Sequence, residues 1–229
     1  MNKIVVLSGA GISAESGLKT FREADGLWEG HDVTKVASPQ GWYDDPEMVL
    51  EFYNQRRKHN LAAKPNDGHK IIAELEKWFD VVIVTQNVDN LHEKAGSGHV
   101  IHLHGQLFQS RSTADPSLVY EMDGWELNLG DKCEKGSQLR PNIVWFGEPV
   151  PLMDEAIAHT LEADILIVIG TSLQVYPAAG LIDCTKSNCK KYVIDPNMPM
   201  VRAQENLTLI EKGGSEGMKQ VKQELLSYQ

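Results

Sequence analysis

The feature that most constrains the fold is a series of short, unbroken runs of apolar and mostly β-branched residues. In the clearest of them, residues 165–169, every side chain is Ile, Leu or Val. A strand with one solvent-exposed face alternates apolar and polar residues, whereas a strand of a parallel sheet that is covered on both faces does not. The runs that we predict to be strands are 3–8, 80–85, 99–104, 142–146, 164–170 and 191–195.

Amphipathic stretches separate these runs and predict helices. The first begins with Asp44-Asp45-Pro46, in which a helix-capping side chain precedes a proline at the first helical position. Strands that alternate with helices predict an α/β fold with a Rossmann-like, doubly wound parallel sheet. The predicted helices span 46–62, 66–78, 152–161 and 215–227.

Two stretches do not fit this alternation and indicate a small inserted module. Residues 22–62 carry loops and a helix but no strand pattern, and residues 108–139 are polar. We therefore expect one domain over residues 1–229. Its core should comprise about 1–21, 63–107 and 140–229, and its small module about 28–62 and 108–139.

Charge and composition restrict the partners. The formal net charge of −10 disfavours nucleic acid, which attracts clusters of Lys and Arg. The apolar run at residues 4–7 is too short for a signal peptide or a membrane span. The three cysteines do not suggest a disulfide framework. We expect a cytoplasmic, reduced, monomeric protein that binds neither nucleic acid nor membranes.

A glycine-rich turn directly follows the first predicted strand. Gly9, Ala10 and Gly11 are small enough to let the backbone approach a pyrophosphate. A dehydrogenase would also carry Asp or Glu at the end of its second strand, but Asp25 lies in a loop. The turn indicates a dinucleotide site of another type; a plain tight turn between strand and helix is the alternative.

Polar residues follow other predicted strands at their carboxyl ends, where α/β sheets bind ligands. Residues 86–89 read Gln-Asn-Val-Asp, and the small residues 170–172 suit a second phosphate or ribose contact. Asp195 can accept hydrogen bonds from ribose hydroxyls. His102 and His104 share one face of a strand, which fits either a metal pair or one structural and one catalytic histidine.

Five sequence blocks follow one another in a defined order along the chain. They are Gly9–Gly17 with Thr20–Arg22 and Gly26–Trp28, then Thr85–His92, Leu103–Gly105, Leu139–Pro141 with Val144–Glu148, and Gly170–Leu173. Together they resemble the catalytic core of the sirtuin family, and the resemblance covers essentially the whole chain. It implies a protein-lysine deacylase that consumes NAD and yields nicotinamide, O-acyl-ADP-ribose and free lysine. Acyl-lysine proteins or peptides would be its substrates.

The resemblance also implies roles for single residues. His104 would be the general base that takes a proton from a ribose hydroxyl, since imidazole can titrate near neutral pH. Asn87 and Asp89 would act with it at the nicotinamide and ribose pocket. The residues implied to bind NAD are Gly9, Ala10, Gly11, Ile12, Glu15, Thr20, Phe21, Arg22, Trp28, Gln86, Asn87, Val88, Asp89, Gly170, Thr171, Ser172, Asp195 and Ser215.

Tyr53 and Arg56 predict a preference for acidic acyl groups. They lie three apart in a predicted helix, and they resemble the Tyr-x-x-Arg pair of desuccinylase sirtuins. A guanidinium binds a carboxylate through two hydrogen bonds, so we expect desuccinylase and demalonylase activity with weaker deacetylase activity. Arg57 and Lys58 are expected to be solvated surface charges. The residues implied to bind substrate are Tyr53, Arg56, Ala37, Val144, Phe146, Gly147, Glu148 and Val175.

The zinc site that is usual in sirtuins is incomplete in this chain. Family members hold zinc with two Cys-x-x-Cys pairs, but here Cys133 stands with Ser112, Asp115 and Gly136. We therefore expect no zinc and no other metal. Packing of apolar residues should hold the small module instead, and the candidates are Leu118, Tyr120, Trp125 and Leu127.

Two other functions fit the sequence less well. An NAD-dependent ADP-ribosyltransferase or NAD hydrolase would use the same cofactor pocket with another acceptor, but Tyr53 and Arg56 favour an acyl-peptide substrate. A non-catalytic NAD-sensing module would not need His104, Asn87 and Asp89 together. If these three residues did not cluster in the structure, the sensing role would be favoured.

Overall fold

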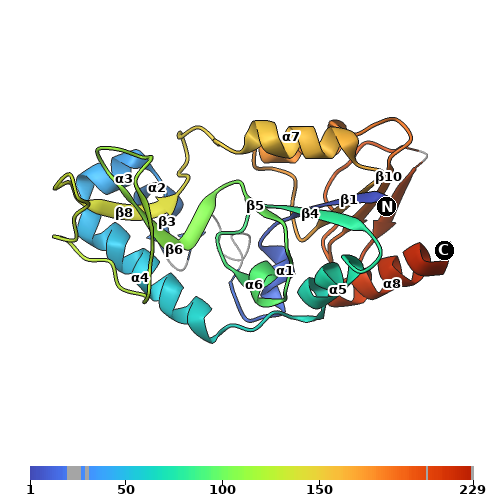
Figure 1. The fold of residues 1–229 in the computed structure, drawn as a ribbon, viewed down its shortest axis with the longest axis horizontal. Helices are drawn as coiled ribbons and strands as arrows, with labels where there is room; N and C mark the ends of the chain where they lie inside the picture. Colours follow the sequence, from blue (N-terminus) through green and yellow to red (C-terminus); the bar gives the residue numbers. More distant parts are fainter. Residues whose placement is uncertain (20–26, 29–30, 205, 228–229) are drawn as a thin grey trace.

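The core of the protein is a six-stranded, entirely parallel sheet. A computed structural model describes residues 1–19, 27–28, 31–204 and 206–227 (Figure 1). Across the sheet the strands are β11 (Leu207–Ile210), β10 (Lys190–Ile194), β9 (Ile165–Ile169), β1 (Lys3–Ser8), β4 (Asp80–Thr85) and β5 (Val100–His102). In sequence order, β4 and β5 lie on one side of β1, and the later strands β9, β10 and β11 lie on its other side. The strand order therefore reverses between β1 and β9.

Helices cover both faces of this sheet, which confirms the doubly wound α/β prediction. Ile4 and Val6 of β1 contribute to one hydrophobic cluster and Val5 and Leu7 to another, so consecutive side chains are buried on opposite faces. The first face packs against α5 (Asp67–Leu75) and α8 (Gly214–Ser227), and the second against α7 (Met153–Glu162) and the 3₁₀ helix η2 (Ala178–Asp183).

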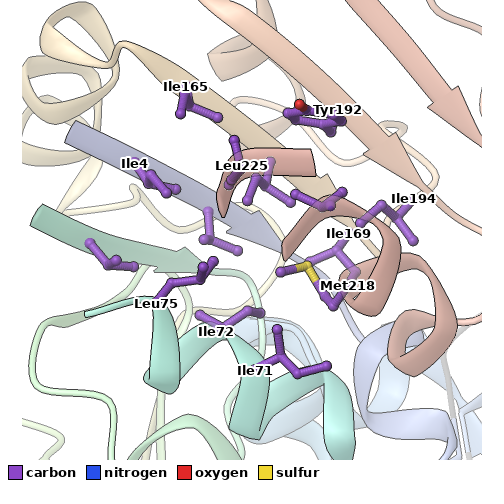
Figure 2. Packing of buried hydrophobic residues seen from close by; sticks show 14 of the residues in the cluster. Ile4, Ile71, Ile72, Leu75, Ile165, Ile169, Tyr192, Ile194, Met218 and Leu225 are labelled. Carbon is purple, nitrogen blue, oxygen red and sulfur yellow. The ribbon is translucent and has the colours of Figure 1, made fainter. Parts of the chain in front are cut away.

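Figure 2 shows the first of these clusters. Ile72 and Leu75 of α5 and Met218 of α8 pack with the strand residues Ile4 and Ile169. All five side chains are fully buried. Fully burying an aliphatic side chain contributes about 1.5–3 kcal/mol, so these contacts hold α5 and α8 firmly against the strands.

The small module has its own sheet and its own core. Strands β6 (Gly105–Ser112), β7 (Val119–Glu121) and β8 (Leu139–Ile143) form an antiparallel sheet in the order β7-β6-β8. A third hydrophobic cluster joins this sheet to α4 through Tyr53, Leu107 and Trp145. The remaining elements are α1 (Gly11–Ala14), β2 (Leu27–Trp28), β3 (His31–Asp32), α2 (Val33–Val36), α3 (Pro39–Asp44), α4 (Pro46–Ala62) and α6 (Leu91–Lys94).

Several sequence-based assignments need correction. The strand predicted at 142–146 is β8, which ends at Ile143 and pairs with β6 in the small sheet rather than with the core. Its apolar side chains pack against α4, and a short apolar run does not reveal which partner it has. Strands β2 and β3 were not expected between residues 22 and 62, and β11 was missed. β2 and β3 have two residues each, which is too short to show a periodicity, and of the four residues of β11 only Ile210 is buried.

Arg57 is another correction, because it is fully buried instead of solvated. Its Nε donates to the carbonyl of Trp125 at 2.7 Å and its Nη1 to the carbonyl of Leu107 at 3.3 Å. Its Nη2 donates to Asn54, which also accepts from the N–H of Leu127 at 2.9 Å. Burial lowers the pKa of Arg57 to about 10.

The long polar segment of the small module is therefore attached to α4 by hydrogen bonds. Of the four apolar residues that were expected to hold this segment, only Leu127 is buried, at 4% exposed. No helix among the described residues combines the length and apolarity that a membrane crossing needs.

We expect Arg57→Met to lower the free energy of unfolding by about 2–4 kcal/mol, because it leaves buried carbonyls and Asn54 without their donor. Lys58→Met is the matched control: this neighbour is exposed, and its ammonium group lies over the face of the Trp125 ring. Urea unfolding measures both variants. Equal stability of the two would contradict the anchoring role of Arg57.

Candidate active site

A cavity of about 510 Å³ lies where the carboxyl ends of the core strands face the small module. In doubly wound sheets, ligands bind at this edge, beside the point where the strand order reverses. Loops after β1, β4, β9 and β10 contribute to its wall from the core, and α4 and the segment after β8 contribute from the small module.

The glycine-rich turn packs directly against the turn after β9. The Gly11 N–H donates to the carbonyl of Gly170 at 2.8 Å, and the Gly9 N–H to that of Ile169 at 3.0 Å. A Cβ on Gly9 or Gly11 would lie 2.7 Å from atoms of Gly170 or Thr171. Gly170 has φ +64°, and a Cβ there would lie 2.2 Å from the backbone nitrogen of Ile12. Only glycine allows the two turns to approach this closely.

Asn87 and Asp89 lie side by side behind the glycine-rich turn. Both contact Ser13: its hydroxyl donates to Asp89 Oδ2 at 3.0 Å, and Asn87 Nδ2 lies 3.3 Å from the same oxygen. Asn87 also donates to the carbonyl of Gly9 at 3.2 Å. Burial raises the pKa of Asp89, against the lowering effect of the hydrogen bonds from Leu91 and Ser13.

His104 lines the cavity next to these residues. Its Nδ1 lies 3.1 Å from the carbonyl of Gln86, and because a carbonyl can only accept, Nδ1 carries the proton. Nε2 is then the basic nitrogen of the neutral ring. Burial lowers the pKa of His104, and the Gln86 carbonyl only partly offsets this effect. At neutral pH the ring is therefore in its neutral form, in which Nε2 can accept a proton.

His102 holds its neighbours in place and does not pair with His104 around a metal. Its Nδ1 lies 2.9 Å from the Asn87 carbonyl and its Nε2 lies 2.6 Å from Glu93 Oε1. Burial lowers the pKa of His102, but the contacts with Glu93 and Asn87 outweigh it and raise the value overall. A protonated ring that donates to both groups fixes the backbone at Asn87.

Tyr53 and Arg56 both line the cavity from α4, together with Ala37. The Tyr53 hydroxyl accepts from Trp145 Nε1 at 3.0 Å, and burial raises the pKa of Tyr53 to about 12. Arg56 is close enough for its charge to lower the pKa values of Tyr53 and Asp89 in part. A cation and a phenol of α4 therefore line the same cavity, close enough for the charge of Arg56 to act on Tyr53.

The rim of the cavity is formed by the segment after β8. Phe146 is 50% exposed, and its N–H donates to the carbonyl of Ala37 at 2.9 Å. The carboxylate of Glu148 accepts from Arg140 at 2.7 Å and from the N–H of Trp145 at 2.8 Å. Burial raises the pKa of Glu148, but these donors bring it below its ordinary value. Glu148 thus stabilises the shape of the rim.

The structure brings most of the predicted site residues together, and some lie elsewhere. Ile12 is buried in the core, and Glu15 accepts from the N–H of Ser215 at 3.1 Å, outside the residues that line the cavity. Thr20, Phe21 and Arg22 lie outside the described residues, and of Trp28 only the backbone in β2 is described. The predicted residues that line the cavity are Gly9, Ala10, Gly11, Ala37, Tyr53, Arg56, Gln86, Asn87, Val88, Asp89, His104, Val144, Phe146, Gly147, Glu148, Gly170, Thr171, Ser172, Val175 and Asp195.

Sequence reasoning missed several residues of the wall. Ser13 belongs to the glycine-rich block, and its position next to a turn that was expected to approach a pyrophosphate could have indicated a role. Trp145 and Ile143 are core-like in sequence, and Tyr176 and Asn197 lie in loops without a pattern. The lining residues that were not predicted include Ser13, Leu18, Lys19, Ile143, Trp145, Val150, Tyr176, Pro177, Pro196 and Asn197.

The residues at the sirtuin zinc positions are bound to one another and to the backbone. The Cys133 thiol donates to the Ser112 hydroxyl at 3.3 Å, and that hydroxyl also accepts from the N–H groups of Ala114 and Asp115. Asp115 forms an ion pair with Lys135 at 2.7 Å, which lowers the pKa of Asp115 to about 2. One thiol and one carboxylate do not make a tetrahedral thiolate site. That these positions hold no zinc remains a prediction.

Comparisons with known proteins agree with this geometry. The model of the Sir2 family matches residues 9–177. An NAD-dependent protein deacylase of Helicobacter pylori is 54% identical and covers 99% of this chain and 98% of its own length. One of Bacteroides thetaiotaomicron is 49% identical and covers 99% of both chains. The solved structure of a Sir2 homolog–NAD complex is 38% identical, with a TM-score of 0.89 over 99% of this chain and 90% of that one.

Two neutral histidines are buried beneath the site and predict a pH-dependent stability. His92 Nε2 lies 2.9 Å from the Ser8 hydroxyl oxygen, and the ring of His69 packs on His92 with centroids 4.9 Å apart. Burial lowers the pKa of His69 to about 4 and that of His92 well below its ordinary value. The unfolded chain then binds more protons between about pH 6.5 and 4, so stability present above pH 6.5 is lost as the pH falls through this range.

For His69 alone this loss is on the order of 3 kcal/mol. We expect His69→Leu to flatten the slope of unfolding free energy against pH between 7 and 4.5, measured by urea unfolding at several pH values. His59→Leu is the control, because His59 is exposed at the end of α4. A slope that is unchanged in His69→Leu would contradict the assignment.

Proposed function

The chain belongs to the Sir2 family of NAD-dependent protein deacylases, and on that premise we propose that it removes succinyl and malonyl groups from protein lysines, and acetyl groups more weakly. The reaction would yield nicotinamide, O-acyl-ADP-ribose and free lysine. The observation that carries the proposal is that Tyr53 and Arg56 line the same cavity as His104. Binding energy for the acyl carboxylate is therefore available close to the reacting groups.

The expected preference for acidic acyl groups follows from the positive charge of Arg56 at the wall of the cavity. A guanidinium in a largely enclosed pocket gains a bidentate partner from a carboxylate and none from an acetyl methyl group. The Tyr53 hydroxyl accepts from Trp145 and can donate its own hydrogen to the same carboxylate. Ala37 is 4% exposed and has a small side chain, which leaves space for the longer acyl chain.

The chain's residues fit NAD at the other end of the cavity. The close approach of the turns at Gly9 and Gly170 leaves a backbone surface without side chains, which suits a pyrophosphate. Asp195 is buried at 2% exposed and lines the cavity, where a carboxylate can accept from ribose hydroxyls. Bound NAD supplies an electrophilic ribose carbon that becomes reactive as nicotinamide leaves.

Three residues would assist this chemistry. Positive charge develops on the ribose as nicotinamide leaves, and the Asp89 side chain and the Asn87 amide provide fixed groups beside it. His104, with Nδ1–H directed at Gln86, would use Nε2 to take a proton from a ribose hydroxyl. Because His102 holds the Asn87 carbonyl, it would act as a positioning residue.

The rim would bind the peptide that carries the acyl-lysine. Phe146 and Tyr176 are both exposed at the mouth of the cavity, at 50% and 75%. Backbone groups of residues 144–148 on one side and Val175 on the other would flank an extended peptide. We include a cytoplasmic location in the proposal, because each of the three cysteines is a free thiol. The monomeric state stays a prediction.

A matched-peptide assay tests the acyl preference. One lysine peptide would be supplied in acetyl, succinyl and malonyl form, with and without NAD. We expect NAD-dependent removal of succinyl well above acetyl, and Arg56→Met should lower kcat/KM for the succinyl peptide by about 30- to 100-fold, because it removes one partner of a desolvated charge pair. Activity on the acetyl peptide should change little.

Gln55→Met provides the matched control, since Gln55 is the exposed neighbour of Arg56 on α4. It should leave all three activities unchanged. Equal or acetyl-dominant turnover by the unmodified protein would reject the acidic preference but keep the deacylase. NAD binding without any turnover would instead favour the transferase or sensing function.

His104→Ala should lower turnover of every acyl peptide by about 10²–10⁴-fold, because it removes the general base. NAD binding, measured by calorimetry, should persist. Since burial lowers the pKa of His104, kcat/KM of the unmodified protein should stay high until the pH falls below the ordinary histidine value of about 6.5. A decline that begins above pH 7 would contradict the role of a base with a lowered pKa.

A further inference from the structure

Two histidines and a glutamate lie close together where the chain before β5 meets α7, away from the cavity. His99 precedes β5, and Glu155 and His159 lie four apart on α7, so they share one face of that helix. One ligand atom of each residue lies within 4.8 Å of the others. None of the three lines the cavity. We propose that His99, Glu155 and His159 bind a divalent transition-metal ion, with zinc as the preferred occupant.

The donor set fits zinc by its chemistry. Imidazole nitrogens and one carboxylate are ligands that zinc takes at about 2.0–2.2 Å, and three protein ligands leave a fourth position for water. Tetrahedral ligands at that distance are about 3.4 Å apart, so the side chains must approach by about 1 Å. His99 and Glu155 are exposed, and exposed side chains can change rotamer to do so.

The state of His159 supports the same conclusion. Its Nδ1 is buried and has no hydrogen-bond partner among the described residues. A buried ring nitrogen without a partner is costly, and a metal ion would satisfy it. The two rings lie at 90° with centroids 5.1 Å apart.

The site would join two elements that both lead to the cavity. β5 is the edge strand that precedes His104, and α7 follows the rim segment that includes Glu148. His99 and His104 are five residues apart, on the order of 10–15 Å, so the ion would connect the elements and not touch the reacting groups. This departs from the expectation of a metal-free protein, which rested on the cysteine positions of the small module.

Titration of the EDTA-treated, full-length protein with ZnCl₂ tests the proposal. We expect saturable binding of one zinc per chain by calorimetry, a rise in Tm with zinc, and the visible absorption of tetrahedral cobalt when CoCl₂ replaces ZnCl₂. His99→Gln and His159→Gln should each abolish saturable binding and the cobalt spectrum. The far-UV circular dichroism of both variants, without metal, should match that of the unmodified protein.

Two further variants exclude other positions of the metal. His59→Gln changes an exposed helical histidine outside the cluster, and Cys133→Ser removes the one thiol of the small module; both should bind zinc as before. Absence of saturable binding by the unmodified protein would overturn the proposal. The proposal would also be overturned if zinc binding survived in both His99→Gln and His159→Gln, whatever the effect of Cys133→Ser.

Discussion

The close contact between two backbone turns sets the geometry on which the rest of this structure depends. Gly9 and Gly11 after β1 meet Gly170 after β9 at distances that exclude any Cβ. β1 and β9 are the neighbours between which the strand order reverses. The turns therefore close the floor of the cavity at the sheet edge and leave it lined by backbone. Asn87 and Asp89, in the loop that follows the neighbouring strand β4, are then fixed against the same floor through Ser13.

The other half of the site depends on how the small module is attached. α4 carries Tyr53 and Arg56 on the side that lines the cavity, and Arg57 with Asn54 on the side that binds the polar segment. One helix thus carries both the positive charge that lines the cavity and the internal hydrogen bonds of the module. The ion pair of the buried His102 with the exposed Glu93 has a similar role on the core side, because His102 also holds the backbone carbonyl of Asn87.

The sequence was sufficient for features that depend on local pattern. β1, β4 and β9 have continuous apolar runs and were predicted almost to the residue, and α4 was predicted with its cap at Asp45. Most candidate site residues also lie around one cavity, because they follow carboxyl strand ends that a parallel sheet brings together. The sequence alone did not reveal which of two adjacent arginines is buried. That depends on tertiary partners such as the carbonyls of Trp125 and Leu107, which carry no sequence signal.

The central claim is that Tyr53 and Arg56 act together on the carboxylate of an acidic acyl group. A double-mutant cycle of Tyr53→Phe and Arg56→Met, measured as kcat/KM on succinyl and acetyl versions of one peptide, tests it most directly. Tyr53→Phe also removes the hydrogen bond from Trp145 to the Tyr53 hydroxyl. That loss affects both peptides, so the measurements on the acetyl peptide correct for it. We predict a coupling energy of about 1–2 kcal/mol on the succinyl peptide and none on the acetyl peptide. Additive effects on the succinyl peptide, or equal coupling on both peptides, would contradict the claim.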